Sequence, residues 1–200
     1  TRSFVGDKDL FLLNPVVDIA GLNRISREVL ASAAEAMAGL IHFRKAVPRP
    51  ISAGDRPLIA ATMFGVTTPC VQRARESLEA AGFEVLVFHA TGAGGQALET
   101  LVRDGQIAAV LDVTTTELAD ELVGGVLSAG ADRLTAAAEM GVPQVISVGA
   151  LDMVNFGPFE TVPERFTGRK FHRHNANVTL MRTTPEECRE LGREIGRKAR

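Results

Sequence analysis

Residues 84–96 read Glu-Val-Leu-Val-Phe-His-Ala-Thr-Gly-Ala-Gly-Gly-Gln, and this stretch contains the strongest local signal in the sequence. Its first part, 84–89, is a short apolar run rich in valine, which is typical of a buried β-strand. Its second part is a glycine-rich turn that leads into an amphipathic helix predicted for 95–104. A strand, a glycine turn and a helix in this order begin a βαβ unit, in which the strands pair in parallel.

The same alternation of short apolar runs and helical stretches continues on both sides of this segment. It predicts further strands at 57–62, 108–112 and 144–148 and further helices at 69–81, 116–123 and 132–140. Gly82, Gly105 and Gly141 each follow a predicted helix, where glycine readily adopts the left-handed conformation that ends it. The pattern therefore predicts an α/β protein, a Rossmann-like open parallel sheet with helices on both faces. Residues 152–177 lose the pattern and are expected to form a loop before a last helix.

The residues before the sheet form a separate segment with one long helix. From about Asn23 to Ala46, apolar residues recur at spacings of three and four, and prolines follow directly. We predict an N-terminal extension at 1–54 and a Rossmann-like lobe at 55–200. The helical pattern at its end suggests a lobe that is truncated at the C-terminus. A helix of this length spans roughly 36 Å, which is more than a small sheet can cover. Its stripe predicts an interlobe contact or a homodimer through 23–46, with Met37, Leu40 and Ile41 near the contact.

Composition excludes several classes of protein. Hydrophobic residues make up 46% and charged residues 23%, which indicates a globular chain rather than a disordered one. The net charge of -2 lacks the basic excess of most nucleic-acid-binding proteins, so no nucleic-acid partner is expected. Apolar runs are far shorter than the roughly 20 residues of a membrane helix, so no membrane partner is expected. The two cysteines, Cys70 and Cys188, and the lack of a signal-peptide pattern predict a cytoplasmic protein.

Ligands of open parallel sheets bind beyond the carboxyl ends of the strands. After the first three predicted strands, glycines or hydroxyl side chains lead into a helix start, where free backbone N–H groups and the helix dipole attract anions. We therefore predict a phosphate-binding site at this edge. The candidate cofactor-binding residues are Gly65, Thr67 and Thr68 in the first loop, Thr91, Gly92, Gly94, Gly95 and Gln96 in the second, and Asp112, Thr114, Thr115, Thr116 and Glu117 in the third.

The glycine loop admits more than one interpretation. Gly92, Gly94 and Ala97 fit the pattern G-x-G-x-x-A, and Asp112 follows about 20 residues on, where a ribose-binding carboxylate is expected in a dinucleotide-binding domain. However, the turn is longer than in that fingerprint, and a plain flexible connection remains a further alternative. If the loop holds a phosphate, Gly94→Val is expected to abolish binding and leave the fold intact.

The three consecutive threonines that follow the third strand, 114–116, also have two interpretations. One of them caps the next helix, or one or two of them contact phosphate or Mg²⁺. Glu117 suits the helix dipole and could equally orient a metal-bound water. The glycine-rich segment 123–131 is expected to be a loop that approaches another backbone.

A second polar cluster is His172-Arg173-His174-Asn175. In an extended segment both imidazoles face the same side. His172, His174 and Asn175 are candidates for substrate or phosphate contact, with a solvated loop as the alternative. No metal site is predicted, because the sequence places no further ligands beside them.

Taken together, these motifs resemble an ATP-binding family typified by the N-terminal region of the tomato mosaic virus resistance protein. The resemblance runs along the whole chain, through 17–23, 62–68, 91–95, 112–117, 174–175 and 181–184. It implies two Rossmann-like lobes, binding of ATP and dimer formation, with no established reaction. It also implies that this chain corresponds to the C-terminal half of the family members. The phosphate-facing role carries over to the loops at 91–96 and 114–117.

The sequence thus favours a nucleotide-binding domain, with ATP and Mg²⁺ as ligands, in a protein of unknown reaction. One competing class is an enzyme acting on a phosphorylated or carboxylated small molecule, with Asp112, Glu117 or His174 in acid–base roles. Another is an interaction protein whose nucleotide site is vestigial. Whether any reaction is catalysed stays open.

Overall fold

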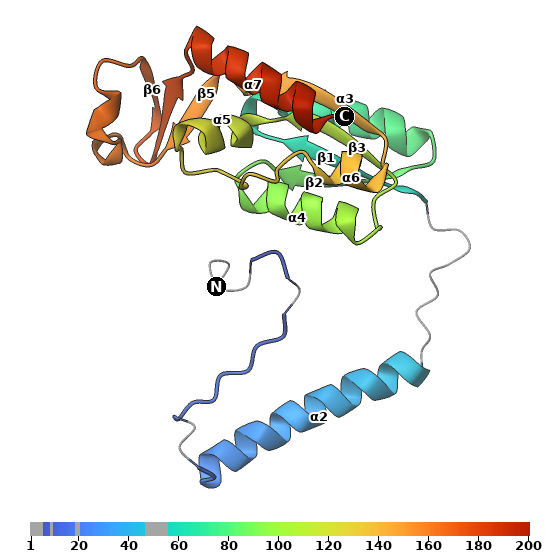
Figure 1. The fold of residues 1–200 in the computed structure, drawn as a ribbon. Coiled ribbons are helices and arrows are strands. Elements are labelled where there is room, and N and C mark those ends of the chain that lie inside the picture. Colours follow the sequence, from blue (N-terminus) through green and yellow to red (C-terminus); the bar gives the residue numbers. More distant parts are fainter. Residues whose placement is uncertain (1–5, 9, 19–20, 47–55) are drawn as a thin grey trace. The chain divides into compact units, whose positions relative to one another are not determined.

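The computed structural model describes residues 6–8, 10–18, 21–46 and 56–200, which belong to two compact units, 1–55 and 56–200. The first unit contains one long helix, α2 (Arg24–Ala46) (Figure 1). Asn23 caps its start, because its side-chain oxygen accepts the N–H of Ser26 at 2.9 Å. In the described part of the chain, no helix has both the length and the apolar character needed to span a membrane.

The second unit is built on the predicted parallel sheet. Its strands are β1 (Leu58–Met63), β2 (Glu84–His89), β3 (Ala109–Thr114) and β4 (Gln144–Gly149), in the spatial order β2-β1-β3-β4. All three neighbouring pairs are parallel. The predicted strands therefore begin within one residue of the observed ones, and the α/β fold class is confirmed.

Helices cover both faces of this sheet. The helices of the second unit are α3 (Thr68–Ala80), α4 (Ala93–Arg103), α5 (Thr116–Val123), α6 (Ala136–Met140) and α7 (Pro185–Lys198), and short 3₁₀ turns lie at Gly65–Thr67, Phe159–Thr161 and Glu164–Phe166. On one face, Ile59 and Val85 pack against Val71 of α3. On the other face, Ala60 packs with Leu98 of α4 and with α6. Successive residues of a strand point to opposite faces, so Ile59 and Ala60 separate the two clusters.

One predicted helix is shorter than expected. The sequence predicts a helix over 132–140, but α6 begins only at Ala136. The preceding residues form turns, and Leu134 has a φ of 78°, which no α-helix accommodates. The prediction was wrong here because the apolar residues of this segment do not lie on one helix. Leu134 is buried from a turn that precedes α6.

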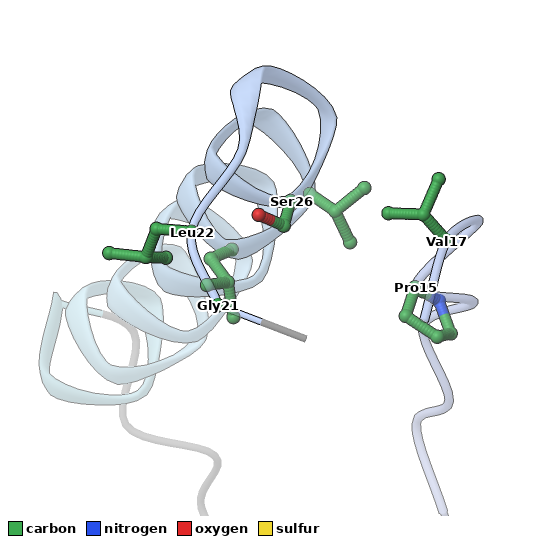
Figure 2. A pocket seen from close by; sticks show the side chains of 7 residues that line it. Pro15, Val17, Gly21, Leu22 and Ser26 are labelled. Carbon is green, nitrogen blue, oxygen red and sulfur yellow. The ribbon is translucent and has the colours of Figure 1, made fainter. Parts of the chain in front are cut away.

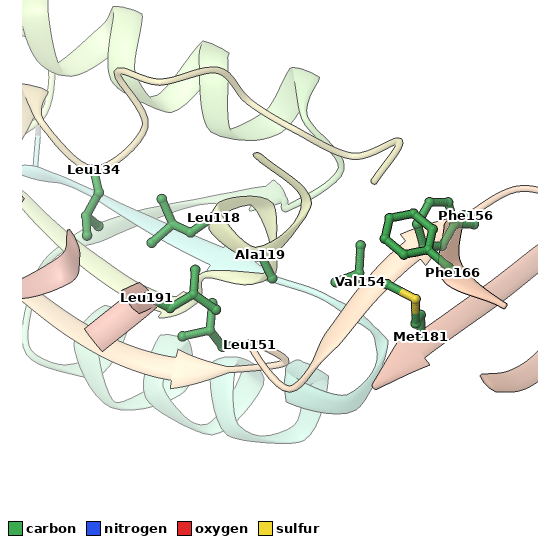
Figure 3. Close-up of a cluster of buried hydrophobic side chains, with 9 residues drawn as sticks. All are labelled: Leu118, Ala119, Leu134, Leu151, Val154, Phe156, Phe166, Met181 and Leu191. Carbon is green, nitrogen blue, oxygen red and sulfur yellow. The ribbon is translucent and has the colours of Figure 1, made fainter. Parts of the chain in front are cut away.

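The region expected to be a loop holds a second sheet. Strands β5 (Met153–Phe156), β6 (Phe171–Asn175) and β7 (Val178–Arg182) form an antiparallel sheet in the order β5-β7-β6. It packs with α5 and α7 around a buried apolar cluster (Figure 3). The cluster consists of Leu118, Ala119, Leu134, Leu151, Val154, Phe156, Phe166, Met181 and Leu191. This core joins the second sheet to the parallel sheet's helices.

Candidate functional site

The strand order places a reversal of direction between β1 and β3, because β2 lies on one side of this pair and β4 on the other. At such a point the loops after the two strands diverge and leave a crevice, which is the usual ligand site of open α/β sheets. The structure brings the first and third predicted loops together here. The hydroxyls of Thr67 and Thr114 are hydrogen-bonded at 2.7 Å.

The three threonines predicted after β3, 114–116, are buried and already bonded within the chain. Thr114 contacts β1, since its backbone N–H donates to the Thr62 hydroxyl at 2.9 Å. The hydroxyl of Thr115 donates to the backbone oxygen of Ser147 on β4 at 2.9 Å, and Thr116 accepts from the Asn155 side chain on β5 at 3.0 Å. These side chains tie the end of β3 to three neighbouring strands. Thr115 occupies the N-cap position of α5 without a capping bond from its side chain.

The glycine loop is occupied by a carboxylate of the chain itself. Glu117 is fully buried, and its Oε1 accepts the backbone N–H groups of Gly92 at 2.7 Å and Gly95 at 3.1 Å. These are the donors that the sequence assigned to a phosphate. The side chain of Glu117 thus takes the place of an anion at the start of α4.

Arg133 joins this carboxylate to two others in a buried ion-pair cluster. Its Nε donates to Glu117 at 2.7 Å, and its two terminal nitrogens hold Asp112 at 2.6 and 2.7 Å. Glu99 of α4 completes the cluster at 3.2 Å from Nη1 and accepts the backbone N–H of Ala136 at 2.8 Å. One cation therefore faces three carboxylates, and hydrogen bonds from backbone N–H groups stabilise the remaining negative charge. Burial raises the pKa of Glu117, against the opposing effect of Arg133.

Asp112 therefore does not lie where a ribose could reach it. Its carboxylate has no exposed surface, and besides Arg133 it accepts the hydroxyl of Thr62 at 2.7 Å. The dinucleotide alternative requires this carboxylate at the ligand, and the fold uses it to hold Arg133 instead. The position of Asp112 therefore gives the dinucleotide alternative no support.

The loop between α5 and Arg133 lies against the glycine loop. Gly92 has a φ of 83°, and a Cβ at this position would come within 2.6 Å of the backbone oxygen of Ser128. A Cβ on Gly125 would come within 2.8 Å of the backbone oxygen of Asn155. The predicted close approach of segment 123–131 to another backbone is confirmed.

Asp120 holds the same loop, 123–131, by hydrogen bonds to its buried carboxylate. Its Oδ1 accepts the backbone N–H groups of Asn155 at 3.0 Å and Leu127 at 3.2 Å, and its Oδ2 accepts the side-chain amide of Asn155 at 2.7 Å. Burial of the carboxyl group outweighs these hydrogen bonds and raises the pKa of Asp120 to about 6.

This raised pKa predicts a pH-dependent effect of Asp120→Asn. The folded chain binds the Asp120 proton more readily than the unfolded chain, whose pKa is near 3.8. The stabilising contribution is therefore complete below pH 3.8 and is lost as the pH rises through about 6. The variant lacks this loss, so its stability relative to the native chain should increase by roughly 2–3 kcal/mol between pH 4 and pH 7. Urea unfolding at both pH values measures the difference, and an unchanged difference contradicts the raised pKa.

Only some of the predicted site residues are accessible to solvent. Gly65 and Gln96 are exposed, and Thr68 and Thr91 are half-buried. Val66 stands beside Gly65 with 78% of its surface exposed. The accessible part of the candidate site thus lies around the loop after β1 and the start of α4.

The histidine pair belongs to a different element. His172, His174 and Asn175 are exposed on β6, an edge strand of the second sheet. The imidazole rings of His172 and His174 are 6.3 Å apart, as expected for alternate residues of a strand. Among the residues that the structure describes, no three histidines, cysteines or carboxylates are arranged to hold a metal ion.

Two family models match consecutive parts of the chain. Residues 56–200 match the C-terminal domain of the uncharacterised protein family UPF0261, and residues 1–46 match its N-terminal domain. The chain belongs to the UPF0261 family. Among similar proteins, a UPF0261 protein of Clostridium tetani is 58% identical over 99% of this chain and 48% of its own length. One of Rhizobium meliloti is 53% identical over 98% of this chain and 48% of its own length.

The plant protein behind the sequence resemblance is also a relative. The ToMV resistance protein Tm-1 of Solanum lycopersicum is 49% identical over 99% of this chain and 26% of its own length. The family predicted from the loop motifs is therefore confirmed. The chain spans about half the length of the bacterial UPF0261 proteins it matches.

Sequence reasoning missed Arg133, Glu99 and Asp120. A signal existed for the two acids, because each lies on the apolar stripe of its helix: Glu99 stands between Leu98 and Val102, which are buried. A carboxylate at such a position needs a buried partner. No comparable pattern marks Arg133, which lies in a turn.

Proposed function

We propose that this chain is part of a nucleotide-binding protein and that the carboxyl ends of β1 and β3 contribute to an ATP site. The observation that carries the proposal is the strand order, which puts the reversal point beside the exposed Gly65 and the start of α3. The groups offered there are the backbone of Gly65 and the side chains of Thr68 and Thr91.

The residues present fit a nucleotide only in part. The loops after the four parallel strands, 64–67, 90–92, 115 and 150–152, contain no lysine or arginine to neutralise phosphates. The N–H groups of Gly92 and Gly95 are engaged by Glu117, and the carboxylates near them are bonded to Arg133. Asp112 and Glu117 are therefore not free to bind Mg²⁺. The triphosphate and its Mg²⁺ would need cationic or acidic groups from the other half of the UPF0261 protein.

An enzyme using Asp112 or Glu117 as acid or base has less support, because both carboxylates are buried and held in ion pairs. His174 is exposed on β6 of the second sheet. In the part of the chain that the structure describes, no hydrogen-bonded group orients its imidazole for proton transfer. We therefore base the test on binding rather than on turnover.

The test places a charge at the proposed site. Val66→Glu adds a carboxylate beside Gly65 at a side chain that is 78% exposed, so the fold should tolerate it. Repulsion from the phosphates should weaken ATP binding about tenfold or more, a loss of at least about 1.4 kcal/mol. Calorimetric titration with ATP and Mg²⁺ measures it in this chain and in a full-length UPF0261 relative carrying the same change.

Val145→Glu is the matched control. Val145 is 64% exposed and lies near the amino end of β4, at the edge of the sheet opposite the carboxyl ends. The ATP affinity of this variant should therefore equal that of the native protein. Equal weakening by both variants would place the site elsewhere. Absence of heat at millimolar ATP in the full-length relative would overturn the proposal.

A further inference from the structure

Helix α2 carries an apolar face that the first unit leaves uncovered. Met37 is 55% exposed, Leu40 50% and Phe43 68%. With Ile25, Leu30 and Ile41 they form a broad stripe on one side of the helix. In the described part of the first unit, no apolar residue is buried. In proteins most of the stability of a helix comes from the packing of its apolar face, so a face of this kind is expected to be covered.

The segment before α2 adds to this unfilled surface. Leu10, Phe11, Leu12 and Leu13 are exposed. A cavity of about 210 Å³ lies between this segment, at Pro15 and Val17, and the start of α2 (Figure 2). Leu22, just before the helix, and Val29 and Leu30 of the helix also line it. Large exposed apolar surfaces are rare on monomeric proteins and mark interfaces.

The family comparison identifies what covers this surface. Residues 1–46, which include all of α2, match the N-terminal domain of UPF0261, whereas the C-terminal domain begins to match only at residue 56. The bacterial relatives extend over twice the length matched by this chain. By sequence, α2 therefore belongs to the N-terminal domain of the family, of which residues 1–46 match a part.

We infer that α2 is a core helix of the UPF0261 N-terminal domain and that its apolar face packs against the rest of that domain. The cavity beside Pro15 receives a side chain of the same domain. This inference rests on the family match and the exposed face, and it does not depend on nucleotide binding. Pairing of two copies through 23–46, the homodimer predicted from the sequence, is the competing occupant.

Hydrogen–deuterium exchange of residues 24–46 separates the two occupants. The chain is compared with a fusion in which the part of the Clostridium tetani relative that precedes the match is joined to Thr1. Amides of α2 should exchange at least about tenfold more slowly in the fusion than in the chain alone. Light scattering on the same samples should show that the slowing occurs within a single copy.

Two substitutions test the face itself. Leu40→Glu should restore fast exchange of α2 in the fusion, because it places a charge in the packed face. Ala31→Glu is the control: Ala31 lies nine residues away, half a turn out of phase and on the opposite side of the helix, and is also exposed. It should leave the slow exchange unchanged.

Two results would overturn the inference. Equally fast exchange in the fusion and in the chain alone would show that the N-terminal domain does not cover α2. A dimer in both proteins that Leu40→Glu dissociates would show that a second copy covers the face. The first comparison uses no substitution, so misfolding of a variant cannot obscure it.

Discussion

Replacing Arg133 by methionine should destabilise the second unit by about 3–5 kcal/mol, a large fraction of the roughly 5–15 kcal/mol by which a domain is usually stable. Arg133 is fully buried and holds the carboxylates of Glu99, Asp112 and Glu117. Its removal leaves three buried acids without a cation. Methionine replaces the aliphatic part of the arginine side chain, so the packing of that part is kept and most of the effect reports the lost guanidinium charge.

Arg103→Met is the matched control. Arg103 also pairs with a glutamate, Glu139, at 3.0 Å, but this pair is exposed and should contribute less than about 1 kcal/mol. Urea unfolding followed by circular dichroism suits both variants, because the chain has no tryptophan or tyrosine. Adding Glu117→Gln to Arg133→Met should recover part of the loss. Similar losses for the two arginine variants would contradict the importance of the buried cluster.

The parallel sheet could be predicted because each of its strands is a short apolar run and each crossover helix follows at a regular distance. Gly105 and Gly141 mark the helix ends, and both adopt the positive φ that the prediction required, at 70° and 65°. These signals are local in the sequence. They do not depend on any tertiary contact, so each predicted strand begins within one residue of the observed one.

The second sheet had no such signal. Strand β5 has four residues and is followed by Gly157 and Pro158, which indicate a turn. Strand β6 consists mostly of exposed polar residues and owes its extended conformation to pairing with β7. Short strands of this kind form because of tertiary packing, which local propensity does not reveal.

The candidate site was half predictable for a related reason. Sequence spacing correctly located polar residues at the carboxyl edge, because strand ends determine where loops lie. It could not show that Glu117 reaches back to Gly92 and Gly95, since these residues are more than twenty positions apart. The helix start attracts an anion in either case, and the chain supplies one from its own α5.

Gly94→Val should destabilise the fold by about 3 kcal/mol, near the upper end of the usual range for overpacking. The sequence favours Gly94 as a residue that leaves room for a phosphate, so that valine would abolish binding in an intact fold. In the structure, a Cβ at Gly94 would instead overlap the backbone oxygen of His89 at the end of β2. Backbone cannot swing aside as a flexible side chain can, so the loss should appear without any ligand.

Gly192→Ala provides the contrast within the same chain. Gly192 lies in α7, and a Cβ there meets no atom within 4 Å. Alanine should therefore stabilise the helix by about 0.5–1 kcal/mol, because glycine loses more backbone entropy on folding. Urea unfolding of both variants in ligand-free buffer measures the difference. If Gly94→Val were as stable as the native chain and only ATP binding were lost, the glycine would serve a phosphate and not the contact with β2.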